Sequence, residues 1–169
     1  MALDIKHFIA LWNSGNKEQT VKDIHLLPVN YGSAIAAHLM SLFCTANRWR
    51  DGTELLELLS LEPKYEFLVG EPLDFYLAAE QWERDTQYLS NMSRTMEHPS
   101  AQKIKNMGQK IISYALGRIQ RAHGWIWFML MDELVDDPPK IPNKMRGKFY
   151  DIGGLWIDWG RKHGYFDKN

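Results

Sequence analysis

Residues 71–122 decide the fold and read EPLDFYLAAEQWERDTQYLSNMSRTMEHPSAQKIKNMGQKIISYALGRIQRA. Apolar or small side chains recur in both halves with the spacing of one helix face. They are Phe75, Ala79, Trp82, Thr86, Leu89 and Met96, and then Ile104, Met107, Ile111, Ala115, Ile119 and Ala122. This spacing predicts two long helices, Phe75–Met96 and Ile104–Ala122. Because a short connector around Pro99 joins them, we expect them to pack antiparallel.

Helical patterns also dominate on either side of this stretch. His123 and Gly124 interrupt the second long helix, and the almost wholly apolar segment that follows is typical of a buried helix. A further amphipathic pattern, Asn143–His163, ends the chain, and its glycines predict close helix packing. The best candidate for a strand is Lys64–Val69, which is short. We therefore predict an all-α fold, a helical bundle of about seven to eight helices with two long antiparallel central helices.

Length and composition indicate one globular domain. The chain has 169 residues, of which 45% are hydrophobic and 24% charged, values that argue against disorder or a collagen-like repeat. A chain of this size buries enough surface to fold without disulfides or metals. We predict a single domain spanning residues 1–169, with a linker at residues 136–142, where three prolines fall within seven residues.

The charge balance argues against two classes of partner. The formal net charge is −1, so no overall basic field attracts a membrane or a nucleic acid. The stretch Gly32–Asn47 holds no Lys or Arg, which argues against a DNA-recognition helix there. Residues 1–75 carry six Lys or Arg and ten Asp or Glu, whereas residues 138–169 carry seven and three. We expect the partner to be another protein, or a second copy in a homo-oligomer, and neither a membrane nor a nucleic acid.

Cysteine content and the N-terminal pattern indicate a cytoplasmic protein. The single cysteine, Cys44, allows no intrachain disulfide, and its apolar surroundings predict a buried thiol in a reducing compartment. Asp4 interrupts the start of the chain, where a signal peptide would have a basic region. The longest apolar run, Trp125–Met131, is seven residues, too short to span a bilayer.

No catalytic or cofactor motif stands out. The chain lacks the phosphate-binding loop, the nucleophile elbow and the paired histidines of zinc hydrolases, so we expect no cofactor and no metal. The densest acidic cluster is Asp132, Glu133, Asp136 and Asp137. We interpret it as a solvated helix end, and leave open whether it binds a cation.

One short motif favours an alternative function. Arg118 is followed five residues later by His123, an arrangement that resembles the signature of HEPN-type ribonucleases, which are all-helical. The resemblance covers six residues and implies that Arg118 holds the scissile phosphate and that His123 acts in acid–base catalysis. Ile119 departs from the family pattern, in which a polar residue commonly follows the arginine.

The C-terminal pattern instead favours a protein-binding surface. The chain is rich in tryptophan, with seven, and tryptophan often anchors protein interfaces. Leu155 and Ile157 lie off the apolar face, and we expect them to be exposed beside a basic rim if the helix packs by one face. If helices pack on both sides of it, they are buried. The predicted protein-binding residues are Lys144, Arg146, Lys148, Leu155, Trp156, Ile157 and Trp159. The sequence thus predicts a non-catalytic protein-binding module, such as an adaptor, an inhibitor, an immunity-type protein or a subunit of an assembly.

Overall fold

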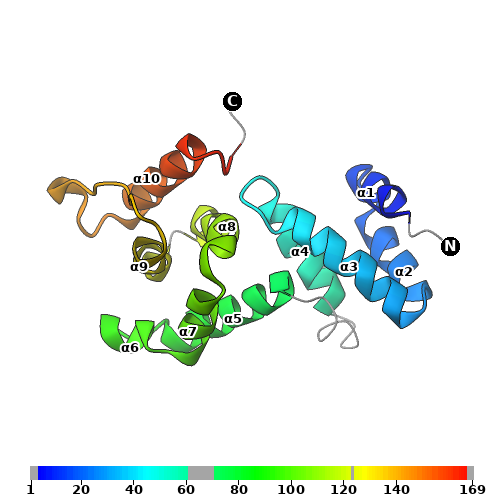
Figure 1. Ribbon diagram of the computed structural model, residues 1–169, viewed down its shortest axis with the longest axis horizontal. Coiled ribbons are helices and arrows are strands. Elements are labelled where there is room, and N and C mark those ends of the chain that lie inside the picture. Colours follow the sequence, from blue (N-terminus) through cyan, green and yellow to red (C-terminus); the bar gives the residue numbers. More distant parts are fainter. Residues whose placement is uncertain (1–3, 61–70, 123, 167–169) are drawn as a thin grey trace. The chain divides into compact units, whose positions relative to one another are not determined.

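The computed structural model describes residues 4–60, 71–122 and 124–166, which contain helices and their connections and no strand (Figure 1). The all-α prediction is confirmed for this part of the chain. Ten α-helices are described, more than the predicted seven to eight. They are α1 (Ile5–Asn13), α2 (Lys17–Leu26), α3 (Val29–Phe43), α4 (Trp49–Ser60), α5 (Glu71–Thr86), α6 (Met92–Met96), α7 (Pro99–Asn106), α8 (Ile112–Ala122), α9 (Trp125–Leu134) and α10 (Phe149–Lys162), with 3-10 turns η2 (Gly108–Ile111) and η3 (Asn143–Met145).

The prediction of two long central helices is wrong, because local signals interrupt each of them. The first ends at Thr86, and Asn91 begins α6 by accepting a hydrogen bond from the backbone N–H of Arg94 at 3.1 Å. The second breaks at Gly108, whose φ of +71° lies in the left-handed region that favours glycine. Apolar spacing continues across both breaks and therefore conceals them. The antiparallel pairing of these segments stays a prediction.

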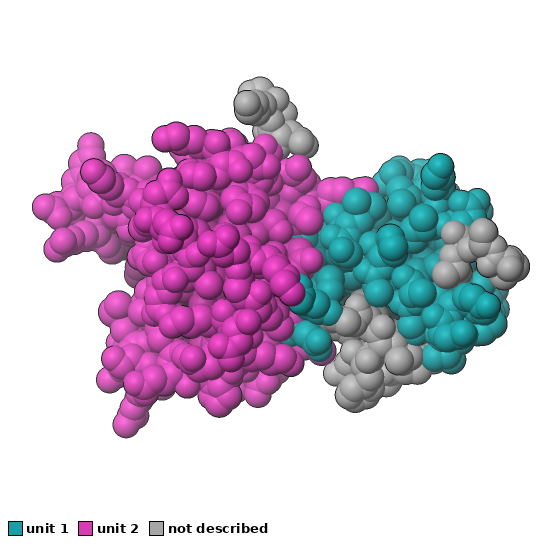
Figure 2. Space-filling view, viewed as in Figure 1, with its two compact units in different colours: residues 1–44, 50–74 teal, residues 45–49, 75–169 magenta. Residues whose placement is uncertain are grey.

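The helices form two compact units, coloured separately in Figure 2. Unit 1 comprises residues 1–44 and 50–74, and unit 2 comprises residues 45–49 and 75–169. Compact units of one chain can unfold in a single cooperative transition, so the prediction of a single domain stays a prediction. The strand candidate Lys64–Val69 lies outside the described residues.

In unit 1, α1 meets α3 and α4 through aromatic and polar contacts. The ring of Trp12 packs on Phe43 at 5.1 Å between centroids, and its indole N–H donates to Asp51 at 2.8 Å. The hydrogen bond from Lys17 to Glu54, with smaller contributions from Coulomb attraction, raises the pKa of Lys17. The Cys44 thiol is buried, as predicted.

In unit 2, α8 packs against both α9 and α10. A Cβ atom at Gly160 would lie 2.9 Å from Leu116 of α8 and 2.7 Å from Phe166, so the glycine permits close helix packing there, as predicted. The same prediction is wrong for Gly154, which is exposed, with nothing within 4 Å of the Cβ position. The close contact therefore lies at the C-terminal end of α10.

The last helix starts later than the sequence pattern indicates. Gly147, with a φ of +78°, separates η3 from α10, so the predicted helix Asn143–His163 is regular only from Phe149. Residues 135–142 form no helix, and this connection projects from the helices of unit 2 (Figure 1). Its start is fixed to α10, because the indole N–H of Trp159 donates to the Asp137 carbonyl at 2.9 Å and His163 Nε2 lies 3.0 Å from the Asp137 carboxylate.

None of the described helices combines the length and the apolar character needed to span a bilayer.

Candidate functional site

Arg118, the arginine of the ribonuclease-like motif, lies inside unit 2. Arg118 as a whole is 1% exposed and lies on the face of α8 that meets α5. Its Nε donates to Glu83 at 3.2 Å, its Nη1 donates to Glu80 at 2.8 Å, and its Nη2 donates to the second Glu83 oxygen. The ring of Tyr76 lies 5.7 Å from the guanidinium carbon. Three donors are therefore engaged by carboxylates of the same unit.

The surroundings of Arg118 extend this network. Glu83 also accepts the indole N–H of Trp127 at 2.6 Å, and Glu80 accepts a second cation, Arg121, at 3.3 Å. Burial lowers the pKa of Arg118, but the two carboxylates more than offset this effect, and the pKa lies above its ordinary value. Burial likewise raises the pKa of Glu80, and the cations outweigh it, so the net shift is downward. Arg118 and Glu80 thus each stabilise the charged form of the other.

This geometry does not present Arg118 to a phosphate. A guanidinium that clamps a substrate must have N–H groups open to the site where charge develops. Here the side chain is 2% exposed and bound to two carboxylates. His123, its predicted catalytic partner, lies outside the described residues, so its pairing with Arg118 stays a prediction.

The apolar residues predicted to bind a partner are mostly used in packing. Trp156 is 0% exposed, and Ile157 and Trp159 are each 8% exposed. Leu155 is half-buried. The expectation that Leu155 and Ile157 are exposed is wrong, because α10 contacts both α8 and α9 and buries a wider face than one apolar stripe. Their part in a partner interface stays a prediction.

The basic residues predicted for the same surface are all exposed. Lys144, Arg146 and Lys148 lie on η3 and the turn that follows, and Lys140 precedes them in the linker. Among the described residues, no carboxylate lies within ion-pair distance of any of the four. Residues 140–150 contain these four cations and no Asp or Glu. The positive charge of this region is therefore presented to solvent.

Two exposed aromatic side chains adjoin these cations, and the sequence pattern missed both. Phe149 is 48% exposed and Tyr150 is 77% exposed. The helical spacing assigned Phe149 to the inward face because it treated Asn143–His163 as one helix. Gly147 is the residue in the sequence that could have indicated a break in the predicted helix. A helix that begins after Gly147 has both aromatic residues in its first turn. We name residues 140–150 the basic–aromatic segment.

The acidic cluster precedes this segment. Asp132, Glu133, Asp136 and Asp137 are all exposed, as predicted for a helix end. Glu133 pairs with Lys105, and Asp137 faces His163. In the described part of the chain, no group of three or more His, Cys, Asp or Glu side chains is arranged to hold a metal ion.

An open pocket of about 200 Å³ adjoins the Arg118 network, between α5 and the start of α9. Trp125, Ile126 and Trp127 form much of its wall, and Glu83 contributes the carboxylate. That carboxylate already accepts bonds from Arg118 and Trp127, so it is placed as a structural acceptor and not as a free base.

Comparison with models of protein families, with curated proteins and with solved structures finds no match to this chain.

Proposed function

We propose that the protein is a non-catalytic binding module whose partner is a protein, and that the basic–aromatic segment is its contact surface. The observation that carries this proposal is the exposure of Phe149 and Tyr150 beside Lys144, Arg146 and Lys148. Exposed aromatic anchors within a charged rim are the usual composition of protein interfaces. An adaptor, an inhibitor, an immunity-type protein and an assembly subunit are the roles that such a surface serves.

The burial of Arg118 supports this proposal over the ribonuclease alternative. Moving Arg118 to a substrate would break its ion pairs with Glu80 and Glu83 and leave Glu83 without a cation, at a cost of several kcal/mol. A cytoplasmic location belongs to the proposal, since the buried free thiol of Cys44 suits a reducing compartment.

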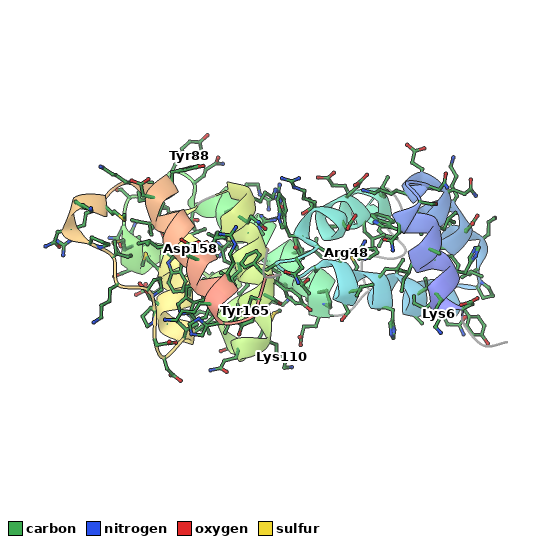
Figure 3. All side chains as sticks on the ribbon, turned by 90° about the horizontal axis from the view of Figure 1, so that it is seen from above. Lys6, Arg48, Tyr88, Lys110, Asp158 and Tyr165 are labelled. Atoms are coloured by element: carbon green, nitrogen blue, oxygen red, sulfur yellow. The ribbon has the colours of Figure 1, made fainter. Side chains whose placement is uncertain are left out.

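The test is affinity capture from the native host with three forms of the full chain. They are the wild type, the double variant Phe149→Ser/Tyr150→Ser, and a control, Tyr88→Ser. Tyr88 is 91% exposed and lies outside the basic–aromatic segment (Figure 3). We expect one protein to be retained by the wild type and by Tyr88→Ser and to be lost from the double variant.

Two outcomes would contradict the proposal. One is recovery of the same proteins with all three forms, which would remove the basic–aromatic segment as the contact. The other is cleavage of RNA by the purified chain that His123→Ala abolishes while the melting temperature stays unchanged.

A further inference from the structure

Residues 132–150 separate their charges into two halves. They read DELVDDPPKIPNKMRGKFY, with four carboxylates and no cation up to Asp137, and four cations and no carboxylate from Lys140 onward. All eight charged residues are exposed. The segment therefore carries a negative half and a positive half on one unit of the fold.

The two halves do not neutralise each other within the chain. Glu133 pairs with Lys105 on α7, and Asp137 lies against His163 on α10. The remaining six charged residues form no ion pair within the described ranges. Three prolines lie between or within the halves, and proline resists the helical turns that would bring neighbouring charges together.

We propose that this segment joins two copies of the chain about a two-fold axis, with the acidic half of each copy against the basic half of the other. This inference rests on the proposed function and names a second copy as the partner. A two-fold interface uses the same surface on both subunits, so it requires a surface complementary to itself. A segment with one acidic half and one basic half meets that requirement when two copies run in opposite directions.

The expected strength follows from the size and chemistry of the segment. Specific interfaces use about 20–30 residues on each side, and this segment has 19. Exposed charge pairs mainly set orientation and the association rate, whereas Phe149 and Tyr150 supply the apolar area that favours binding. We therefore expect a weak dimer that added salt dissociates.

The first measurement is sedimentation equilibrium of the full chain at low ionic strength. We expect a species of twice the 19.7 kDa chain mass that declines as salt is raised. A single-chain mass at concentrations up to about 1 mM, where an interaction of about −4 kcal/mol would be detected, would overturn the inference.

The second measurement reverses the charge of each half. Lys144→Glu/Arg146→Glu/Lys148→Glu makes both halves acidic, and Asp132→Lys/Glu133→Lys/Asp136→Lys makes the acidic half basic. Each variant alone should dimerise about tenfold or more weakly, because like charges then face each other. An equimolar mixture should restore the dimer, because an acidic copy then faces a basic one at both halves.

Matched reversals elsewhere provide the control. Lys6→Glu/Lys22→Glu/Lys103→Glu and Glu18→Lys/Glu57→Lys/Glu97→Lys change equal numbers of exposed charges outside the segment and should leave the dimer unchanged. A dimer that ignores both reversals within the segment, or variants that do not recover when mixed, would overturn the two-fold pairing. A monomeric wild type that still captures a different protein through Phe149 and Tyr150 would overturn this inference and leave the proposed function intact. A monomer that binds single-stranded RNA through the three cations would overturn both.

Discussion

Arg118 and Arg146 lie in the same unit and have opposite surroundings. Arg118 is 1% exposed and donates to two carboxylates, while Arg146 is exposed and has no ion-pair partner in the described structure. The motif predicts that Arg118 binds a phosphate. In the structure, Arg118 is instead buried and paired with carboxylates of its own unit. The comparison shows that burial and pairing, more than the identity of the residue, separate a cation that holds the fold together from one that is available to a partner.

The same contrast occurs along α10. Trp156 is fully buried against the unit, while Phe149, near the start of the helix, is half exposed. One helix thus has a packing face and a terminus open to a partner. Four variants test this division, in order of decreasing effect.

Replacing Arg118 by Ala should have the largest effect. The change leaves Glu83 without its cation and leaves Glu80 with Arg121 alone. Breaking a buried ion pair costs about 3–5 kcal/mol, and the lower end applies because both carboxylates are part exposed. We expect denaturant titration to show a loss of this size in the free energy of unfolding. Arg146→Ala is the control and should change stability by about 0.5 kcal/mol or less. Equal losses in the two variants would contradict the comparison.

Replacing Ile157 by Ala tests the packing face of α10. Ile157 is 8% exposed, and removing a buried aliphatic side chain costs about 2–5 kcal/mol. Phe149→Ala removes a larger side chain from a half-exposed position and should cost less. Thermal unfolding of both variants checks this order, and a greater loss for Phe149→Ala would show that the start of α10 belongs to the core.

Replacing Trp127 by Phe removes the indole N–H that Glu83 accepts and keeps an aromatic ring in the core. A hydrogen bond to a charged group contributes about 1.5–3 kcal/mol. We expect a loss near the lower end, because Arg118 still binds Glu83. Measured in the Glu83→Gln background, where the amide oxygen can still accept the indole N–H, the same substitution should cost less, and an unchanged cost would show that the charge of Glu83 does not strengthen the bond.

Replacing Glu80 by Gln tests the acid dependence of the Arg118 network. The cations hold the pKa of Glu80 below its ordinary value, despite burial, which acts in the opposite direction and is the largest single effect. The stabilisation is therefore complete above the unfolded pKa and is lost as pH falls through the lower folded pKa. When unfolding is measured from about pH 7 to about pH 3, the free energy of unfolding should fall less in the variant than in the wild type.

The matched variant for this measurement is Glu97→Gln. Glu97 is exposed and has no ion-pair partner in the described part of the chain. If Glu97→Gln reduces the fall in the free energy of unfolding at low pH as much as Glu80→Gln does, the effect does not arise from the Arg118 network.

Sequence periodicity predicts the helical class well and the helix ends poorly. The apolar spacing through Trp82 and Ile119 places both in the core, as observed. The same spacing runs unbroken through residues 86–92 and through Gly108, because residues after a break can return to the same face. Local capping and positive φ angles decide where a helix stops, and periodicity does not report them.

The sequence predicts the exposed cations of the candidate site but not its exposed aromatic side chains. Lys144, Arg146 and Lys148 are exposed as expected, since cations rarely leave water without a partner. The exposure of Ile157 depended on how many helices cover α10, which is a property of tertiary packing. The carboxylates that bind Arg118 lie 35 and 38 residues away in the chain, so no local pattern reveals them.

The anchoring of Asp137 to Trp159 and His163 has a consequence for how the chain tolerates change. With Asp137 held at one end and α10 beginning at Phe149 at the other, the intervening residues connect two fixed points. The entropy of closing such a connection grows slowly, by about 0.6 kcal/mol for each doubling of its length. Insertions between Pro138 and Gly147 should therefore be accepted by the fold at low cost. This is the position at which related chains would diverge in length, and at which an epitope or a fluorescent reporter can be placed without disturbing the core.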